Sequence, residues 1–246
     1  MNLLLLSNSR SPGAPYLAHA LDAIRETAGT HARVFFVPFA GVTVAWDDFA
    51  ATVRLALGPL GLTVESAHDG ARVEDADVVM VGGGNSFHLL KHCRERGLLE
   101  RISRRVRDGA PYIGWSAGAN LACPTIRTTN DMPIVETGSL DALGLVDFQI
   151  NPHFTNELPA GHQGETRADR LAEFLAVNPS VQVLGLPEGD WVRVRGGSLT
   201  LAGPKPALWF RAGEAPLPLE PGPLPAAFRL RLAATIPSRS TPPIES

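Results

Sequence analysis

Short, continuous apolar runs alternate with amphipathic segments along the first half of the chain. The runs at residues 3–6, 34–37 and 78–81 are typical of strands that are buried on both faces of a sheet. Between them, apolar residues recur at helical spacing, for example at 16–24 and 49–57. This alternation predicts an α/β fold with a doubly wound, mostly parallel sheet flanked by helices, and with functional sites at the carboxyl ends of the strands.

The second half of the chain continues this pattern and then changes it. Residues 148–150 and 181–186 are expected to be strands, with a helix between them at 165–174. Three later segments are short, alternate between apolar and polar residues, and are bounded by glycine or proline, which is typical of antiparallel strands. They are residues 191–195, 199–202 and 207–210. We therefore expect a small antiparallel edge on the parallel sheet.

The length of the chain favours one large domain over two small ones. Its 246 residues, 44% of them hydrophobic, are enough to bury a substantial core. After residue 214 the composition changes, and eight of the 21 prolines lie in this last part. We expect a single α/β domain at residues 1–214 and a loosely ordered, Pro-rich tail at 215–246, with a docked strand at 228–232 as the alternative.

Charge, cysteine content and the N-terminal sequence limit the binding partners and the cellular compartment that we expect for the protein. A net charge of −3 without a basic cluster gives no electrostatic footprint for nucleic acid. Cys93 and Cys123 are too few for a disulfide framework or a cysteine zinc site, which indicates a reducing compartment. The apolar run at 3–6 fits neither a signal peptide nor a membrane span. We expect a cytoplasmic protein, monomer or homodimer, with no metal, cofactor, nucleic-acid or membrane partner.

The most informative segment is Gly114-Trp115-Ser116-Ala117-Gly118, which ends an apolar run and precedes a series of small residues. This is the strand-turn-helix pattern of a nucleophile elbow. The elbow needs glycine on either side of the serine because the turn is sharp, so that a side chain there would collide with the crossing backbone. The turn would expose the Ser116 hydroxyl and leave the N–H of Ala117 free to face an anion. A glycine-rich turn with a passive serine is the alternative.

A serine hydroxyl is a poor nucleophile at neutral pH, so Ser116 needs a general base. His153 closely follows the predicted strand at 148–150, and in a parallel sheet this strand end lies on the same rim as Ser116. His162, in a loop with glycine on both sides, is the second candidate. Two carboxylates compete for the third position of a triad. Strand-end position favours Glu188, whereas Asp131 would give the order Ser, Asp, His of the α/β-hydrolases.

A glycine-rich loop at residues 82–85 follows the predicted strand at 78–81. Glycines let backbone amides approach a ligand closely, and a helix N-terminus adds partial positive charge. The loop lacks the Lys and Ser/Thr of a Walker motif and the last glycine of a dinucleotide fingerprint. Next to an elbow, it is best interpreted as a second oxyanion element, with phosphate binding as the alternative.

Five segments carry a combination of motifs that is more specific than an elbow alone. They are residues 3–9, 82–85, 112–135, 151–156 and 164–167. In these segments the chain closely resembles the peptidase E family of α-aspartyl dipeptidases, and the resemblance extends from residue 1 to about residue 214. It implies a serine peptidase with a class I glutamine amidotransferase-like fold that cleaves dipeptides with an N-terminal aspartate. The amidotransferases differ because their nucleophile is cysteine.

The resemblance also implies roles for the catalytic candidates. Ser116 matches the family nucleophile and His153 its base, while Glu188 and Asp131 both match acids proposed for the third position. The sequence leaves the choice between these two carboxylates open. A cyanophycinase-like peptidase, which would take a polymer, is the second enzyme hypothesis, and a non-catalytic module that holds a small anion is the alternative outside enzymes.

The remaining matches concern substrate binding. Gly84 and Ala117 match the amides of the family's oxyanion hole, and Arg167 matches a residue expected to bind the substrate aspartate side chain. Independently of the family, an arginine fork can hold a carboxylate through two charge-assisted hydrogen bonds and so discriminate against a neutral analogue. A surface arginine that pairs with Glu165 or Asp169 is the alternative.

Overall fold

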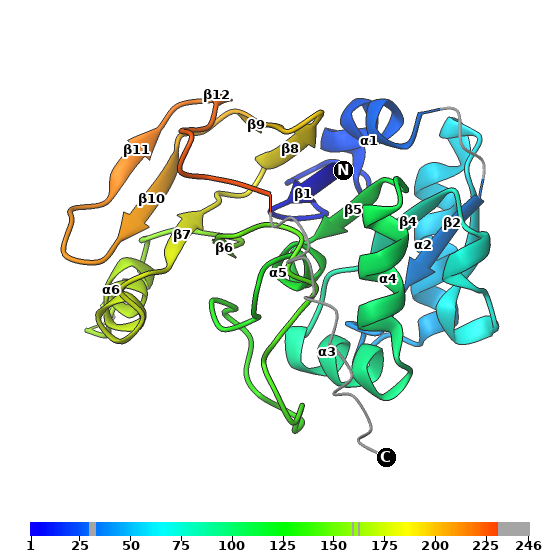
Figure 1. The fold of residues 1–246 in the computed structure, drawn as a ribbon, viewed down its shortest axis with the longest axis horizontal. Helices are drawn as coiled ribbons and strands as arrows, with labels where there is room; N and C mark the ends of the chain where they lie inside the picture. The colour runs from blue at the N-terminus through cyan, green and yellow to red at the C-terminus, as the bar shows by residue number, and fades with distance from the viewer. Residues whose placement is uncertain (30–32, 159, 162, 231–246) are drawn as a thin grey trace, which may run out of the picture.

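The apolar runs of the first half of the chain form the parallel centre of an eight-stranded sheet. The computed structural model describes residues 1–29, 33–158, 160–161 and 163–230. The main sheet has the strand order β12-β9-β8-β1-β5-β4-β2-β3 (Figure 1). Its parallel strands are β1 (Asn2–Leu6), β2 (Arg33–Val37), β3 (Thr63–Ser66), β4 (Val78–Val81) and β5 (Tyr112–Trp115).

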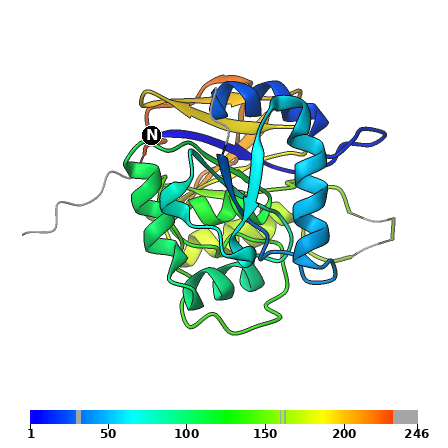
Figure 2. The ribbon, with the colours of Figure 1, turned by 90° about the vertical axis from the view of Figure 1, so that its right-hand side faces the viewer.

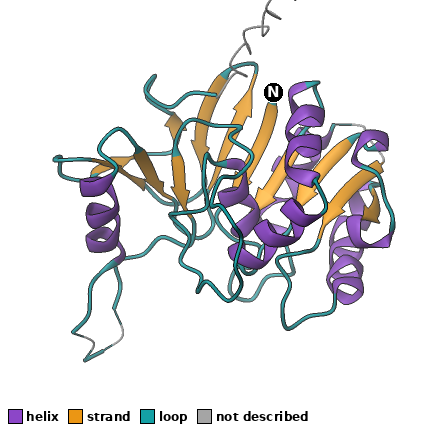
Figure 3. Ribbon diagram, turned by 60° about the horizontal axis from the view of Figure 1, so that its bottom comes forward, coloured by secondary structure: helices purple, strands orange, loops and turns teal. Residues whose placement is uncertain are grey.

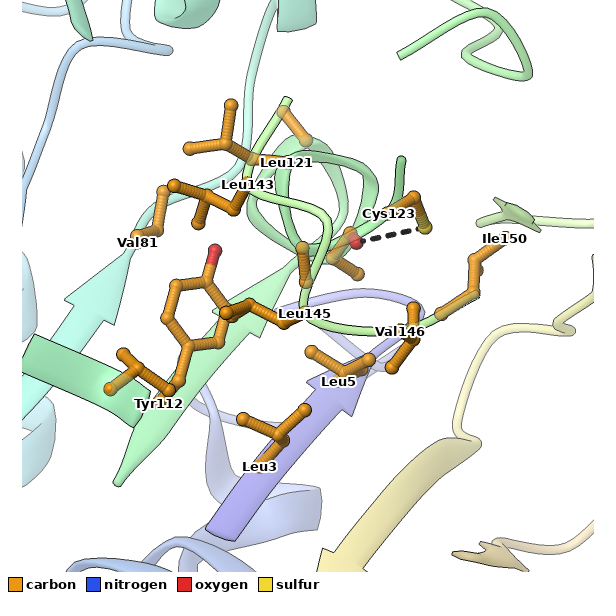
Figure 4. Packing of buried hydrophobic residues seen from close by; sticks show 14 of the residues in the cluster. Leu3, Leu5, Val81, Tyr112, Leu121, Cys123, Leu143, Leu145, Val146 and Ile150 are labelled. Atoms are coloured by element: carbon orange, nitrogen blue, oxygen red, sulfur yellow. Dashed lines mark hydrogen bonds between the residues drawn. The ribbon is translucent and has the colours of Figure 1, made fainter. Parts of the chain in front are cut away.

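Helices cover both faces of this sheet because the central strands are apolar on both sides (Figure 2). Leu4 and Leu6 pack with residues of the first two helices, whereas Leu3 and Leu5 belong to the cluster on the other face, together with Tyr112 (Figure 4). The helices are α1 (Leu21–Ala28), α2 (Trp46–Leu57), α3 (Ser86–Glu95), α4 (Leu98–Arg107) and α5 (Ala117–Ala122), with short 3-10 helices at Ala18–Ala20, Gly58–Leu60, Ala67–Asp69 and Val73–Asp75. The expected doubly wound, mostly parallel fold is confirmed.

Antiparallel strands extend the main sheet beyond β1. β8 (Trp191–Arg195) pairs with β1 and with β9 (Ser198–Ala202), and β12 (Gly222–Pro223) pairs with β9. Val192 and Val194 of β8 are buried while their neighbours are partly exposed or exposed, as an alternating segment requires. The antiparallel edge is confirmed for residues 191–195 and 199–202, whereas residues 207–210, which were expected to be part of it, form an antiparallel strand of a second sheet.

A second sheet, with the order β11-β10-β7-β6, lies on the left of Figure 1 and is packed against α6 (Figure 3). Its elements are β6 (Gln149–Asn151), α6 (Arg167–Val177), β7 (Gln182–Gly185), β10 (Ala207–Arg211) and β11 (Leu217–Leu219). The strand pattern predicts β5 and β6 in one parallel sheet, but β6 pairs with β7 in this second sheet. The reason is that β8 occupies the free edge of β1, so the main sheet offers no position beside β1 for β6.

Buried polar side chains, rather than strand pairing, connect the two sheets. Asn120 Nδ2 of α5 and Thr128 Oγ1 both donate to the carbonyl of Ile150 in β6, at 2.6 and 2.8 Å. Ser7 Oγ, directly after β1, donates to the carbonyl of Leu186, directly after β7, at 2.8 Å. All three donor side chains are buried, so these bonds lie away from water, where hydrogen bonds are electrostatically strongest. They fix the ends of β6 and β7 against the main sheet.

Residues 215–230, the first part of the predicted tail, lie against the domain. β11 pairs with β10, β12 pairs with β9, and the buried ring of Phe228 packs against Phe148 and Trp209. Leu230 forms a bridge with Val146, and residues 231–246 lie outside the described part. The expected loose order is therefore not found for 215–230, because strand pairing and an aromatic anchor hold them. The division of the chain at residue 214 stays a prediction.

The close packing of α5 on β4 can be tested at Gly118. A Cβ at this position would lie 2.2 Å from the carbonyl oxygen of Val81, a backbone atom that cannot move aside. We expect Gly118→Ala to lower the free energy of unfolding by about 1–3 kcal/mol or more, as measured by urea denaturation. Gly58→Ala is the matched control, because no atom lies within 4 Å of its added Cβ and its φ is −50°. Equal stability of the two variants would contradict this packing.

Candidate active site

Ser116 lies in a strained turn between β5 and α5, as expected for an elbow. Its φ is 54° and its ψ is −113°, a conformation that residues with a side chain rarely adopt. Its N–H donates to the carbonyl of Leu6, 3.0 Å away at the end of the neighbouring strand. Such a conformation costs about 1–3 kcal/mol and persists only where the surrounding structure enforces it.

The glycines around Ser116 are required by the close approach of three backbone segments. A Cβ added at Gly114 would lie 2.4 Å from the carbonyl oxygen of Gly118. A Cβ added at Gly83 would lie 2.9 Å from the Cβ atom of Ser116. Both distances are shorter than non-bonded carbon contacts, so the turn, the helix after it and the glycine loop fit together only without these side chains.

His153 connects Ser116 to Glu188 in a continuous chain of hydrogen bonds. His153 Nε2 is 2.9 Å from Ser116 Oγ, and His153 Nδ1 is 2.6 Å from Glu188 Oε1. An ionised carboxylate can only accept, so Nδ1 of the neutral ring carries the proton and Nε2 is left to accept the serine proton. The His153 side chain is 35% exposed, which leaves it within reach of a substrate.

Hydrogen bonds to its backbone hold His153 in place. Its φ of 52° is also unusual for a residue with a side chain, and Pro152 before it prevents β6 from continuing regularly. The His153 N–H donates to Ser7 Oγ at 2.8 Å. The His153 carbonyl accepts a hydrogen bond from Arg167 Nη1, at the start of α6. The same Ser7 hydroxyl that links the two sheets therefore also positions the imidazole.

Asp131, the rival carboxylate, has other partners. Its Oδ2 atom accepts hydrogen bonds from the Ser86 N–H at 2.7 Å and from Thr129 Oγ1 at 2.9 Å. These contacts place Asp131 at the N-terminus of α3, where the helix dipole favours a negative charge. Glu188, and not Asp131, is thus the carboxylate that contacts the imidazole of His153.

The glycine loop approaches Ser116 as expected for an oxyanion element. Gly84 has a φ of 137°, and a Cβ there would lie 2.2 Å from the carbonyl oxygen of Ala40, so only glycine fits. In the turns, loops and helix ends of the described residues, no backbone carbonyl accepts a hydrogen bond from the N–H of Gly84 or of Ala117. Gly84 lines the same cavity as Ser116. Two amides are therefore available beside the serine hydroxyl.

A cavity of about 800 Å³ opens above Ser116 and His153. Charged side chains on its described walls are Arg10, Asp131 and Arg167. Burial lowers the pKa of Arg167, whose guanidinium nevertheless stays protonated at neutral pH because arginine is ionised in proteins at all ordinary pH values. The cavity can therefore hold a small molecule that carries carboxylates.

His162, the second candidate for the general base, lies outside the described residues. The Nδ1 atom of His88, which follows the glycine loop, is 2.6 Å from the carbonyl oxygen of Phe39. No cluster of three or more His, Cys, Asp or Glu side chains with metal-binding geometry occurs in the described part of the chain. Sequence reasoning missed the roles of Ser7 and Asn120. The polar triplet at 7–9, directly after the buried leucines, was the available signal for Ser7.

A serine, a histidine and a carboxylate linked in this order, beside a cavity at the end of a parallel strand, define a serine hydrolase on an α/β sheet. The model of peptidase family S51 matches residues 3–202, which is most of the chain. The chain therefore belongs to peptidase family S51. This membership confirms the family resemblance found in the sequence and the expectation of a serine dipeptidase, while its substrate specificity stays a prediction.

Individual relatives agree with this assignment. The chain is 56% identical over 226 residues to Peptidase E of Escherichia coli and of Shigella boydii serotype 18, covering 90% of this chain and 99% of each relative. A putative peptidase E from Listeria monocytogenes EGD-e superimposes with a TM-score of 0.62 at 23% identity, covering 83% of this chain and 98% of that one. A peptidase from an acI-B1 Actinobacterium gives a TM-score of 0.60 at 18% identity, covering 89% and 96%. At these identities the two solved structures show the fold alone.

The double role of Ser7 predicts a measurable loss of stability in Ser7→Ala. This change removes the bond to Leu186 and leaves the partly buried N–H of His153 without its acceptor. We expect the free energy of unfolding to fall by about 1–3 kcal/mol in urea denaturation. Ser180→Ala, at an exposed position, is the control and should change stability by less than about 0.5 kcal/mol. A Ser7→Ala protein as stable as the control would rule out this role.

Proposed function

We propose that this serine dipeptidase hydrolyses dipeptides whose first residue is aspartate, and that Ser116, His153 and Glu188 carry out the reaction. The observation that carries the proposal is the hydrogen-bonded chain from Ser116 Oγ through His153 to Glu188 at a cavity that also contains Arg167. The chain contains the groups that a serine peptidase needs, and Arg167 supplies a group that can select an acidic side chain.

In the first step, Ser116 Oγ attacks the carbonyl carbon of the substrate's aspartate residue while His153 Nε2 accepts the hydroxyl proton. Glu188 accepts the Nδ1–H bond of His153 and stabilises the imidazolium that forms. The negative charge that develops on the carbonyl oxygen is stabilised by the N–H groups of Gly84 and Ala117.

The tetrahedral intermediate then collapses. His153 gives its proton to the nitrogen of the leaving residue, the C–N bond breaks, and an aspartyl ester remains on Ser116. Water enters the place of the leaving residue and loses a proton to His153 as it attacks the ester. Return of this proton to Ser116 Oγ releases aspartate and restores the enzyme.

Selection of aspartate is assigned to Arg167. Its Nη1 atom donates hydrogen bonds to the carbonyls of Pro152 and His153. The remaining N–H donors of the guanidinium are therefore available to a carboxylate in the cavity. A neutral asparagine or leucine side chain in the same place would leave a partly buried cation unpaired, which is costly.

We also propose a cytoplasmic location for the enzyme. Cys93 and Cys123 are both buried and free, which suits a reducing compartment. Over the described residues, none of the helices combines the length and the apolar character that crossing a bilayer requires.

The nucleophile is tested by Ser116→Ala. Because serine and histidine act as one unit, we expect the rate of aspartyl-leucine hydrolysis to fall roughly 10³- to 10⁶-fold, with an unchanged thermal unfolding midpoint. A fluorophosphonate probe should label the wild-type protein and not the variant. Hydrolysis at the wild-type rate by Ser116→Ala would remove Ser116 from the mechanism.

The specificity residue is tested by Arg167→Met. We expect the ratio of kcat/KM for aspartyl-leucine over asparaginyl-leucine to fall about 10²- to 10⁴-fold. This ratio is the measurement of choice because Arg167 also contacts the carbonyl of His153, so total activity can fall for a second reason. Arg170→Met, on the same helix and with a 67% exposed side chain, is the matched control and should keep the ratio. A retained preference in Arg167→Met would show that another group selects the acid.

A further inference from the structure

The charges on the cavity wall correspond to those of an aspartyl dipeptide. Among the described residues that line the cavity, Arg10 and Arg167 carry permanent positive charges, and Asp131 is the carboxylate. At neutral pH such a dipeptide carries two carboxylates and one ammonium group. The cavity therefore presents one acidic side chain for the one cationic group of the substrate. This inference rests on the proposed function and deepens it.

One oxygen of Asp131 is available for a ligand. Oδ2 accepts the two hydrogen bonds from Ser86 and Thr129, whereas Oδ1 accepts none from a described residue. The Asp131 residue is half-buried and lines the cavity together with Ser116. An ionised carboxylate has about four lone-pair sites, so Oδ1 retains the capacity to accept bonds from an ammonium group.

The carboxylate is held rigidly beside the glycine loop. Besides the bond from the Ser86 N–H, Ser86 Oγ lies 2.9 Å from Thr129 Oγ1, and Asn85 Nδ2 donates to the carbonyl of Met132 at 2.9 Å. These bonds attach the segment around Asp131 to the first turn of α3. A binding group fixed in this way loses little conformational entropy when a ligand arrives.

The location of this carboxylate fits the geometry of the substrate. Gly84, the proposed oxyanion donor, lies two positions before Ser86, to which Asp131 is bonded. In an aspartyl dipeptide, the ammonium nitrogen and the scissile carbonyl are attached to the same Cα atom. A group that binds the ammonium must therefore lie close to the amides that bind the carbonyl oxygen. We propose that Asp131 Oδ1 binds the α-ammonium group of the substrate's N-terminal residue.

Asp131 is then a specificity residue and not a member of the catalytic triad. This role explains why Asp131, which makes no hydrogen bond to His153, lines the active-site cavity. It also makes a free amino terminus a requirement for tight binding, because a blocked substrate would leave a partly buried carboxylate unpaired.

The experiment compares two inhibitors that differ only in the amino group. Inhibition constants for L-aspartate and for succinate are measured against aspartyl-leucine hydrolysis by the wild-type enzyme and by Asp131→Asn. Asparagine keeps the shape of the side chain and an acceptor for the Ser86 N–H, so the fold should be retained. We expect the inhibition constant of L-aspartate to rise about 10- to 100-fold in the variant, while that of succinate stays within about twofold.

Two further variants separate the roles of the neighbouring groups. Glu188→Gln should lower kcat and keep the ratio of the two inhibition constants, because Glu188 acts on His153. Arg167→Met should weaken both inhibitors, because both carry the carboxylate that Arg167 binds. A fall in kcat of Asp131→Asn without a change in aspartate inhibition, or an equal loss for both inhibitors, would overturn the ammonium assignment alone. A wild-type enzyme that fails to cleave aspartyl-leucine would refute the proposed function and this assignment with it.

Discussion

The Ser7 hydroxyl is the contact on which the geometry of the site depends. It donates to the carbonyl of Leu186 and accepts from the N–H of His153, so it joins the main sheet to the second sheet and positions the imidazole at the same time. The group is buried, and the main sheet offers no strand pairing to replace it. Asn120 and Thr128 reinforce the connection at Ile150. Ser116 and His153 thus come from two sheets that buried polar side chains hold together.

The elbow concentrates strain and close packing at one point. Ser116 adopts a positive φ because its N–H is bonded to β1 and because the helix after it lies against β4 without an intervening side chain. This conformation costs about 1–3 kcal/mol, and the burial of apolar side chains on both faces of the sheet offsets that cost. The benefit is functional, since the hydroxyl is presented to the cavity and the Ala117 N–H is left free for an anion.

The two carboxylates near the site have different surroundings and suit different tasks. Glu188, whose side chain is 53% exposed, contacts the imidazole and can balance its charge during the reaction. Asp131 lines the cavity beside the N-terminus of α3; its Oδ2 atom accepts two hydrogen bonds and its Oδ1 atom is available to a ligand. Arg167 contributes to both aspects of the site, because it supports the His153 carbonyl and faces the cavity. In the proposed mechanism, the two carboxylates thus serve catalysis and recognition from separate elements, while Arg167 takes part in both.

The sequence by itself determined the elements whose signal is local. Buried strands appear as continuous apolar runs, the elbow as glycines around Ser116, and His153 as a polar residue directly after a strand, because each depends on neighbours along the chain. Tertiary structure alone decided which sheet β6 joins, which of Glu188 and Asp131 reaches the imidazole, and that residues 215–230 pack on the domain. These outcomes depend on pairings between residues far apart in the chain. Such pairings are selected by the free edges and volumes of the assembled fold, which no local pattern records.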